Sequence, residues 1–412
     1  MQTQLLPSLI SFIASLAAFL FRTNAKITKC FALAACLLML AVEIYFNSRS
    51  LLSISTILLA TLMALVCILS QATNKSAAIS TALILAILGL TSLFLLDVDP
   101  LISKLAQGIL TLSLVILSFR FRKKNVSLGF GSAAALSISM LSLLLSSLVH
   151  GTWSVICQIT AAAVLLPLFP LHVGYIGLLN NLPGTVPAFL SFILPIAGLH
   201  ALVQVQEIPP LAAEFFVVTT IIGLFISGAR AFVQTGLMRI IAAVASILLA
   251  PVWWICSANG KLGSENCSYI IAVGLVVAGL SLCAHCVESR YGTQSLESLP
   301  GLAKKMPKLG IAFSLLTMAG LGIPTFAIFS SFILPQFSPL QSRVSDLLFV
   351  SLAWFICFAL QISVLQRLLF NEPRADLLYS DLNRSEFMSL AIILVLLLIG
   401  GIFPGVMLAL TT

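Results

Sequence analysis

Charged residues are scarce in this sequence. Asp, Glu, Lys and Arg make up 8% of its 412 residues, whereas about 25% is usual in a soluble domain. Hydrophobic residues make up 60%, and apolar runs long enough to cross a bilayer recur along the whole chain. This composition excludes a soluble domain of appreciable size and predicts an all-α protein that crosses a membrane many times.

The motifs of a catalytic centre are also missing. We find no nucleophile–base arrangement, no Walker-type phosphate loop and no dinucleotide fingerprint. Cys283 and Cys286 have CxxC spacing, but no second half of a zinc site accompanies them, so a metal site is not predicted. We therefore expect no cofactor, no metal and no catalytic residue in this chain.

Fourteen apolar stretches are candidate membrane spans. The first has no basic region before it and no small-residue cleavage site, so we interpret it as a retained helix rather than a signal peptide. The fourteen spans cover residues 5–21, 27–46, 51–71, 77–96, 101–118, 127–149, 152–171, 185–205, 210–229, 238–257, 268–287, 309–335, 344–369 and 387–410.

Positive charge is distributed unevenly between these spans. The 21 Lys and Arg residues all lie in or beside the odd-numbered connections, except Arg49, Lys104, Lys261 and Arg343. The positive-inside rule then predicts a bacterial-type inner-membrane protein with both termini on the non-cytoplasmic side. The membrane topology thus explains the net charge of +8, and nucleic acid is not an expected partner. Lipid is an expected partner at basic connections such as 120–124, because clustered Lys and Arg attract anionic headgroups.

Two of the spans are interrupted, the seventh and the twelfth. Prolines remove backbone donors and end helices, and an interrupted span often marks the transport path of a carrier. The first interruption precedes a buried-looking histidine, His172. The helix-break residues are Pro167, Pro170 and Pro183 around the seventh span and Gly322 and Pro324 in the twelfth.

Because the broken spans lie five apart, the sequence predicts two five-helix repeats, the second inverted relative to the first. The predicted organisation is an N-terminal three-helix segment over 1–76 and a first repeat over 77–206, broken near 165–172. A second repeat follows over 207–370, broken near 320–326, and a cytoplasmic loop and last helix occupy 371–412.

Three short motifs resemble one family of membrane proteins. Pro170-Leu171-His172, followed by Pro183, resembles the P-L-H…A-P signature of the antiporter-like subunits of respiratory complex I and of Mrp-type cation/proton antiporters. The segment from Ala231 to Arg239 resembles the family's A-x-x-Q-x-D-[IL]-K-R motif, and Gly322-Ile323-Pro324 with Phe329 and Phe332 resembles its G-[LM]-P…F-x-x-[EK]-F element. The resemblance covers roughly residues 85 to 410 and implies fourteen helices with both termini outside.

The ionisable residues that the resemblance implies within the membrane are replaced in this chain. The family has Glu on the fifth helix, Lys on the seventh and eighth, His on the tenth and eleventh, and Lys or Glu on the twelfth. The matching positions here are Gln107, Leu165, Ile196, Leu248 or a neighbour, Val273 and Ser331. Amide and hydroxyl groups orient water but hold no proton at accessible pH. The candidate ion-path residues that remain are Gln107, His172, His200, Gln234, Arg239 and Ser331.

Three functions are compatible with this pattern. The first is a degenerate, weakly pumping or non-pumping scaffold subunit of a complex I-related or Mrp-related assembly, with other integral membrane subunits, further antiporter-like ones among them, as partners. Its enzymatic role would be that of a membrane subunit in an NADH:quinone oxidoreductase-like translocase. The second is an active proton or sodium translocator, for example in an inorganic-carbon uptake or membrane hydrogenase complex, that uses His172, His200 and water. The third is a free-standing carrier for another solute.

Overall fold

The computed structural model describes residues 5–45, 51–95, 99–121, 128–205, 208–259, 265–296, 301–336, 344–370, 372, 380–403 and 405. Several residues used above lie outside this part of the chain. They are Arg49, Lys261, Arg343, residues 122–124 of the basic connection, and residues 371 and 373–379 of the predicted loop 371–386.

The described chain is helical, as the composition predicts, apart from one isolated β-bridge between Gly236 and Ser295. A helix satisfies its backbone hydrogen bonds within one segment, which hydrocarbon surroundings require. Among the described residues, ten helices are long and apolar enough to cross a membrane, and shorter apolar helices accompany them. The expectation of an all-α protein with many membrane spans is therefore confirmed.

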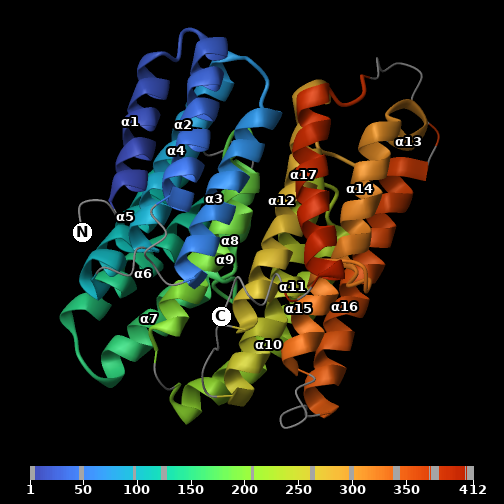
Figure 1. Ribbon diagram of the computed structural model, residues 1–412. Coiled ribbons are helices and arrows are strands. Elements are labelled where there is room, and N and C mark those ends of the chain that lie inside the picture. The colour runs from blue at the N-terminus through green and yellow to red at the C-terminus, as the bar shows by residue number, and fades with distance from the viewer. Residues whose placement is uncertain are drawn as a thin grey trace. The chain divides into compact units, whose positions relative to one another are not determined.

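The chain divides into two compact units. The first comprises Met1–Leu166 and Val173–Val205. Within it α9 is almost wholly buried and packs against α3, α4, α7 and α8, while α1 lies against α4 (Figure 1). Its helices are α1 Leu6–Leu20, α2 Ala25–Tyr45, α3 Leu51–Ser70, α4 Lys75–Phe94, α5 Pro100–Arg120, α6 Leu128–Leu148, α7 Thr152–Leu165, α8 Val173–Asn181 and α9 Val186–Val203.

The second unit comprises Pro167–His172 and Gln206–Leu408. Its centre is α12, which is almost wholly buried and packs against α11, α14, α15 and α17. Its helices are α10 Pro210–Val233, α11 Leu237–Asn259, α12 Glu265–Tyr291, α13 Leu302–Lys305, α14 Pro307–Gly320, α15 Ala327–Gln336, α16 Val344–Leu365, the π-helical turn η1 Gln366–Phe370 and α17 Arg384–Ile402.

Both predicted helix breaks are confirmed. The first separates α7 from α8 over residues 166–172, and the second separates α14 from α15 over residues 321–326. Pro167 and Pro170 lie in the first break, and Gly322 and Pro324 lie in the second. Gly322 has a φ of +71°, a conformation that favours glycine, so this residue permits the second break.

One element was not predicted as a helix. The sequence interpretation ended the seventh span at residue 171 and began the eighth at residue 185, whereas Val173–Asn181 between them forms α8. This helix has nine residues, too few to appear as a span in a hydropathy window. It packs tightly on α6, where a side chain at Gly177 would overlap Ser132.

Two long helices contain a proline, and a tyrosine lies at each. Pro195 in α9 has no N–H for the carbonyl of Ser191, and the Tyr175 hydroxyl of α8 donates to that oxygen at 3.5 Å. Pro251 has no N–H for the carbonyl of Ile247 in α11, and the Tyr269 hydroxyl of α12 donates to the carbonyl of the next residue, Leu248, at 2.7 Å. Both phenol groups are buried, so each finds its hydrogen-bond partner in the backbone beside a helical proline.

Candidate functional site

The first helix break folds residues 166–172 into a short non-helical link. Leu166 is extended and donates its N–H to the Ala162 carbonyl at 2.7 Å, which completes the last turn of α7. The link ends where the His172 N–H donates to the Leu168 carbonyl at 2.8 Å, just before α8 begins. The break therefore directs Phe169 and His172 out of the line of α7.

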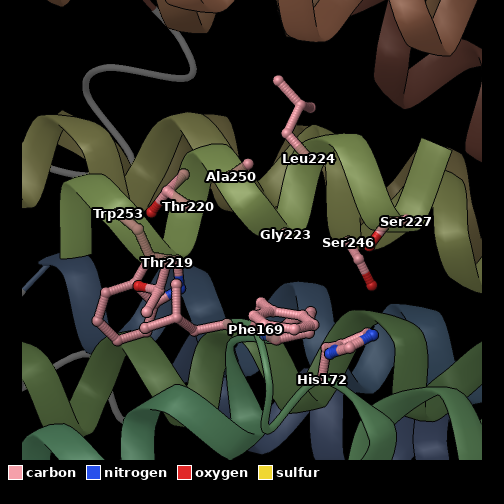
Figure 2. Close-up of a pocket in the computed structure, with 12 residues that line it drawn as sticks. Phe169, His172, Thr219, Thr220, Gly223, Leu224, Ser227, Ser246, Ala250 and Trp253 are labelled. Carbon is pink, nitrogen blue, oxygen red and sulfur yellow. The ribbon is translucent and has the colours of Figure 1, made fainter. Parts of the chain in front are cut away.

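A small cavity lies beside this link within the second unit. One face of α10 lines it with Thr219, Thr220, Gly223, Leu224 and Ser227, and α11 contributes Ser246, Ala250 and Trp253. The link contributes the remaining lining residues, Pro167, Leu168, Phe169 and His172. In Figure 2, Ser227 and Ser246 lie toward the His172 end of the cavity, and Thr219 and Trp253 lie toward the other end.

The cavity has a volume of about 10 Å³, which is room for about one water molecule. The cavity is small because Phe169 packs directly against Gly223. A methyl group added at Gly223 would lie 2.7 Å from the Phe169 Cβ. No small-molecule substrate fits in such a volume, since ligand sites are usually of several hundred Å³. The cavity therefore suits water only.

His172 is the one ionisable side chain among the residues that line this cavity. It is 2% exposed, and its ring lies 5.4 Å from that of Phe169. No described residue forms a hydrogen bond with either ring nitrogen, although the Pro170 carbonyl and the Arg230 guanidinium are near enough to act on the ring's charge. An unpaired buried imidazole is costly, and one water in the cavity would supply a partner.

In the first unit, Gln107, which the sequence resemblance sets at the position of a glutamate, lies on α5. Its amide is 1% exposed and donates to the Ala197 carbonyl of α9. Leu165 and Ile196, which the resemblance sets at lysine positions, are buried as well. Gly198 lets α9 approach the first break, because a methyl group there would lie 2.8 Å from the Leu166 nitrogen. The three positions thus join α5, α7 and α9 by packing and by one neutral hydrogen bond.

His200 lies in the last turn of α9 and is only half-buried. Its Nε2 lies 3.4 Å from the Ser103 hydroxyl, and its Nδ1 lies 3.5 Å from the amide nitrogen of Gln204. The ring packs edge-on against Phe94, with centroids 5.5 Å apart. His200 is therefore a helix-end residue held by polar neighbours.

Pro183 lies in the turn between α8 and α9, in a cluster of neutral polar groups. The Pro183 carbonyl accepts a hydrogen bond from Ser80 at 3.4 Å. Thr185 donates to the Cys67 carbonyl at 3.0 Å and accepts from the Gln71 amide at 2.7 Å. These bonds fix the start of α9 against α3 and α4.

Just after the second break lies Ser331, which the sequence resemblance sets at a lysine or glutamate position. This hydroxyl is buried and donates to the Ala327 carbonyl of its own helix at 2.5 Å. Leu248 and Val273, which the resemblance sets at or near histidine positions, are fully buried and apolar. These three side chains of the second unit hold no charge.

Gln234 and Arg239 lie at the ends of two helices rather than in their middles. Gln234 is the C-cap residue of α10, and Arg239 lies in the first turn of α11. The Arg239 Nη1 donates to the Gln234 Oε1 at 3.4 Å. The structure therefore brings together two pairs of the six candidate ion-path residues. Gln234 bonds to Arg239, and Gln107 and His200 lie about one helical turn apart where α5 meets α9, since Gln107 bonds to Ala197 and Ser103 contacts His200. His172 lines the cavity, and Ser331 bonds to its own helix.

The sequence interpretation missed three buried polar residues. The Asn181 amide, the Thr220 hydroxyl and the Gln361 amide have no hydrogen-bond partner among the described residues. Asn181 and Thr220 are 2% exposed and Gln361 is 4% exposed. Each lies close to a helix break in sequence or space: Asn181 ends α8, Thr220 lines the cavity, and the Gln361 amide packs on Gly320. The signal that could have identified these three residues is a polar side chain within an otherwise apolar stretch.

Cys283 and Cys286 lie on one turn within α12, and both are buried. No group of three His, Cys, Asp or Glu side chains in the described part of the chain lies close enough together to hold a metal ion. In this setting the two thiols pack as small apolar groups.

Comparisons with known proteins agree with this architecture. The family model described as "NADH:quinone oxidoreductase/Mrp antiporter, TM" matches residues 48–357. Two relatives are the F(420)H(2) dehydrogenase subunit M of Methanosarcina mazei, 30% identical over 137 residues, and the NAD(P)H-quinone oxidoreductase chain 4 1 of Synechococcus elongatus, 31% identical over 179 residues. The alignments cover 32% and 42% of this chain and only 27% and 33% of those relatives.

Solved structures match almost the whole chain. A chain in respiratory complex I from Thermus thermophilus has a TM-score of 0.77 at 16% identity, with 99% of this chain and 97% of that one covered. A chain in the Mrp complex from Dietzia sp. DQ12-45-1b has a TM-score of 0.79 at 14% identity, with 100% and 96% covered. At such low identity these matches establish the fold.

Proposed function

The chain belongs to the NADH:quinone oxidoreductase/Mrp antiporter transmembrane family, and from that premise we propose that it is a scaffold subunit of a multi-subunit membrane complex. In this proposal it moves few or no protons itself. It contributes helices that other integral membrane subunits pack against, and both its termini lie on the non-cytoplasmic side of the membrane.

The observation behind this proposal is that neutral side chains occupy the six positions that we match to ionisable residues of the family. A proton relay needs groups that change charge in succession. Here Leu165, Ile196 and Val273 are buried and apolar, and the polar groups of Gln107 and Ser331 are already bound to backbone carbonyls. Exchange of buried ions for apolar residues is often neutral or stabilising, so a subunit released from pumping can keep its fold.

Assembly with partners is supported by the fact that related chains are subunits of multi-subunit complexes. The relatives are named as subunits or chains of oxidoreductases, and the matching structures are complex I, an Mrp complex and the archaeal membrane-bound sulfane sulfur reductase. We propose that this chain likewise sits beside further antiporter-like subunits.

One observation favours a second function, active translocation through His172 and water. His172 has unpaired nitrogens beside a cavity with room for about one water molecule. However, the other polar groups that line this cavity are hydroxyls, so the histidine has no titratable neighbour there to receive a proton. The same small volume argues against a carrier for a larger solute.

The test is proton transport by the intact complex. The complex would be purified through a tag on this chain, its subunits identified, and the assembly reconstituted in liposomes with a pH-sensitive dye. We expect the number of protons moved per turnover to be unchanged when His172→Leu and His200→Leu are combined. A clear drop in that ratio, with the complex still assembled, would sink the scaffold proposal and favour translocation.

A further inference from the structure

A second hollow lies at the end of α10 in the second unit, apart from the cavity at His172. Arg367 of η1 and Gln234 of α10 line it, and Arg239 is hydrogen-bonded to that Gln234. The other lining residues are mostly apolar: Ala231, Phe232, Ile240, Leu296, Leu360, Ser363 and Val364. Guanidinium groups thus lie at the edge of an apolar surface.

The arginines at this hollow have no acidic partner in the described part of the chain. Arg367 is exposed and Arg239 is half-buried. The salt bridge found among the described residues joins a different arginine, Arg290, to Glu386. A guanidinium has five N–H donors, and the bond to Gln234 occupies one of those of Arg239. Most donors around the hollow therefore remain available to an outside acceptor.

The apolar side chains around the hollow indicate where it meets the membrane. Phe232 is 44% exposed, Val233 81% and Phe370 70%. Large apolar side chains with such exposure belong in hydrocarbon, and arginines at the ends of spans extend to the headgroup level. The hollow therefore lies at the boundary between acyl chains and headgroups, at the end that the positive-inside rule assigns to the cytoplasm.

We propose that this hollow binds an anionic phospholipid. Its phosphate oxygens accept hydrogen bonds from Arg239 and Arg367, in the bidentate geometry that suits guanidinium and phosphate. One acyl chain lies along the exposed side chain of Phe232. The closed part of the hollow is only about 10 Å³, so it takes a single headgroup atom while the rest of the lipid lies along the surface.

The experiment is native mass spectrometry of the full chain in detergent, titrated with phosphatidylglycerol or, separately, with phosphatidylcholine. We expect one phosphatidylglycerol to bind in preference to phosphatidylcholine. The double variant Arg239→Gln/Arg367→Gln should weaken that binding on the order of twentyfold, roughly fivefold for each charge near an anionic headgroup. The variant Arg239→Lys/Arg367→Lys keeps both charges but loses the bidentate hydrogen bonds, so it should bind more tightly than the double Gln variant and less tightly than the unaltered chain. This intermediate binding would show that the loss in the Gln variant is not due to unfolding.

Arg120→Gln is the matched control, because Arg120 is an exposed arginine at the end of α5 that does not line this hollow. It should bind phosphatidylglycerol as the unaltered chain does. The proposal is overturned if the double Gln variant binds this lipid equally well, or if inorganic phosphate at millimolar concentration displaces it completely. It is also overturned if, in the purified complex, cross-links from position 367 reach a partner subunit and the lipid is absent.

Discussion

A substitution at His172 distinguishes a structural role of this residue from a role in transport. Its imidazole is buried, its two nitrogens have no partner among the described residues, and the adjoining cavity has room for about one water molecule. A histidine without a transport role would destabilise the folded state here, because unpaired buried polar groups cost free energy.

We therefore expect His172→Leu to change the free energy of unfolding by less than about 1 kcal/mol, or to raise it, since the replacement removes a polar group of similar bulk. Thermal unfolding of the purified chain in detergent is the measurement. The control is Phe169→Ala, which removes packing against Gly223 and should cost about 3 kcal/mol. Strong destabilisation by His172→Leu would show that the imidazole has hydrogen bonds that stabilise the break.

At the scale of single elements, the tyrosine beside each helical proline is the feature to test. Tyr269 donates to the Leu248 carbonyl at 2.7 Å near Pro251, whereas Tyr175 reaches the Ser191 carbonyl near Pro195 only at 3.5 Å. The first is a good hydrogen bond and the second is weak by distance. The two tyrosines therefore serve as a matched pair.

Tyr269→Phe should lower the free energy of unfolding by about 1.5 kcal/mol, because it removes a well-formed buried hydrogen bond to the Leu248 carbonyl. Tyr175→Phe should cost less than about 0.5 kcal/mol, because its hydrogen bond is long. Chemical denaturation monitored in detergent measures both. Pro251→Ala restores an N–H for the Ile247 carbonyl and not for that of Leu248, so the loss on Tyr269→Phe should be similar in that background. Equal losses for the two tyrosines would contradict this account of the two hydrogen bonds.

The last helix depends on a polar anchor at its start. Arg290 of α12 donates to Glu386, to the Asp381 carbonyl and to Ser380, and Glu386 also accepts from the Asn383 N–H in a capping box. The Asp381 carboxylate in turn accepts the N–H groups of Lys308 and Leu309 at the start of α14. This anchor joins α12, α14 and α17.

Arg290→Met should therefore destabilise the second unit by about 3 kcal/mol, since it leaves the mostly buried Glu386 without its cation. Limited proteolysis near residue 380, compared before and after the substitution, reports on the docking of α17. The double variant Arg290→Met/Glu386→Leu removes both charges and should recover part of the loss. If cleavage is unchanged by Arg290→Met, the salt bridge does not hold the last helix.

At the scale of the whole molecule, the distribution of Lys and Arg makes a prediction about orientation. Both termini should lie outside the cytoplasm, because the basic connections follow the odd-numbered spans. Alkaline phosphatase, which is active only outside the cytoplasm, should therefore be active when fused to either end. A fluorescent protein inserted into the connection at 122–127 should be fluorescent. The opposite pattern would show that the chain is inserted the other way round.

Much of the fold was accessible from the sequence, because span length and helix breaks are local properties. Hydropathy set the spans, and Pro167, Pro170, Gly322 and Pro324 located both breaks. The short helix α8 was missed because nine residues give too little signal. The cavity could not be predicted, since it gathers Phe169 and His172 with residues of α10 and α11 that are distant in the chain. The same holds for the pairing of Gln107 with the Ala197 carbonyl.

The packed interior at Leu165 and Ile196 has a consequence for how this chain can evolve. These side chains are 1% and 2% exposed on α7 and α9, which pack together. A lysine introduced at either position alone would bury an ammonium group without a carboxylate beside it, at a cost of several kcal/mol. Gln107 is neutral and would not offset that charge. Single substitutions to lysine at these positions are therefore disfavoured, and a lysine and its acidic partner would have to enter together.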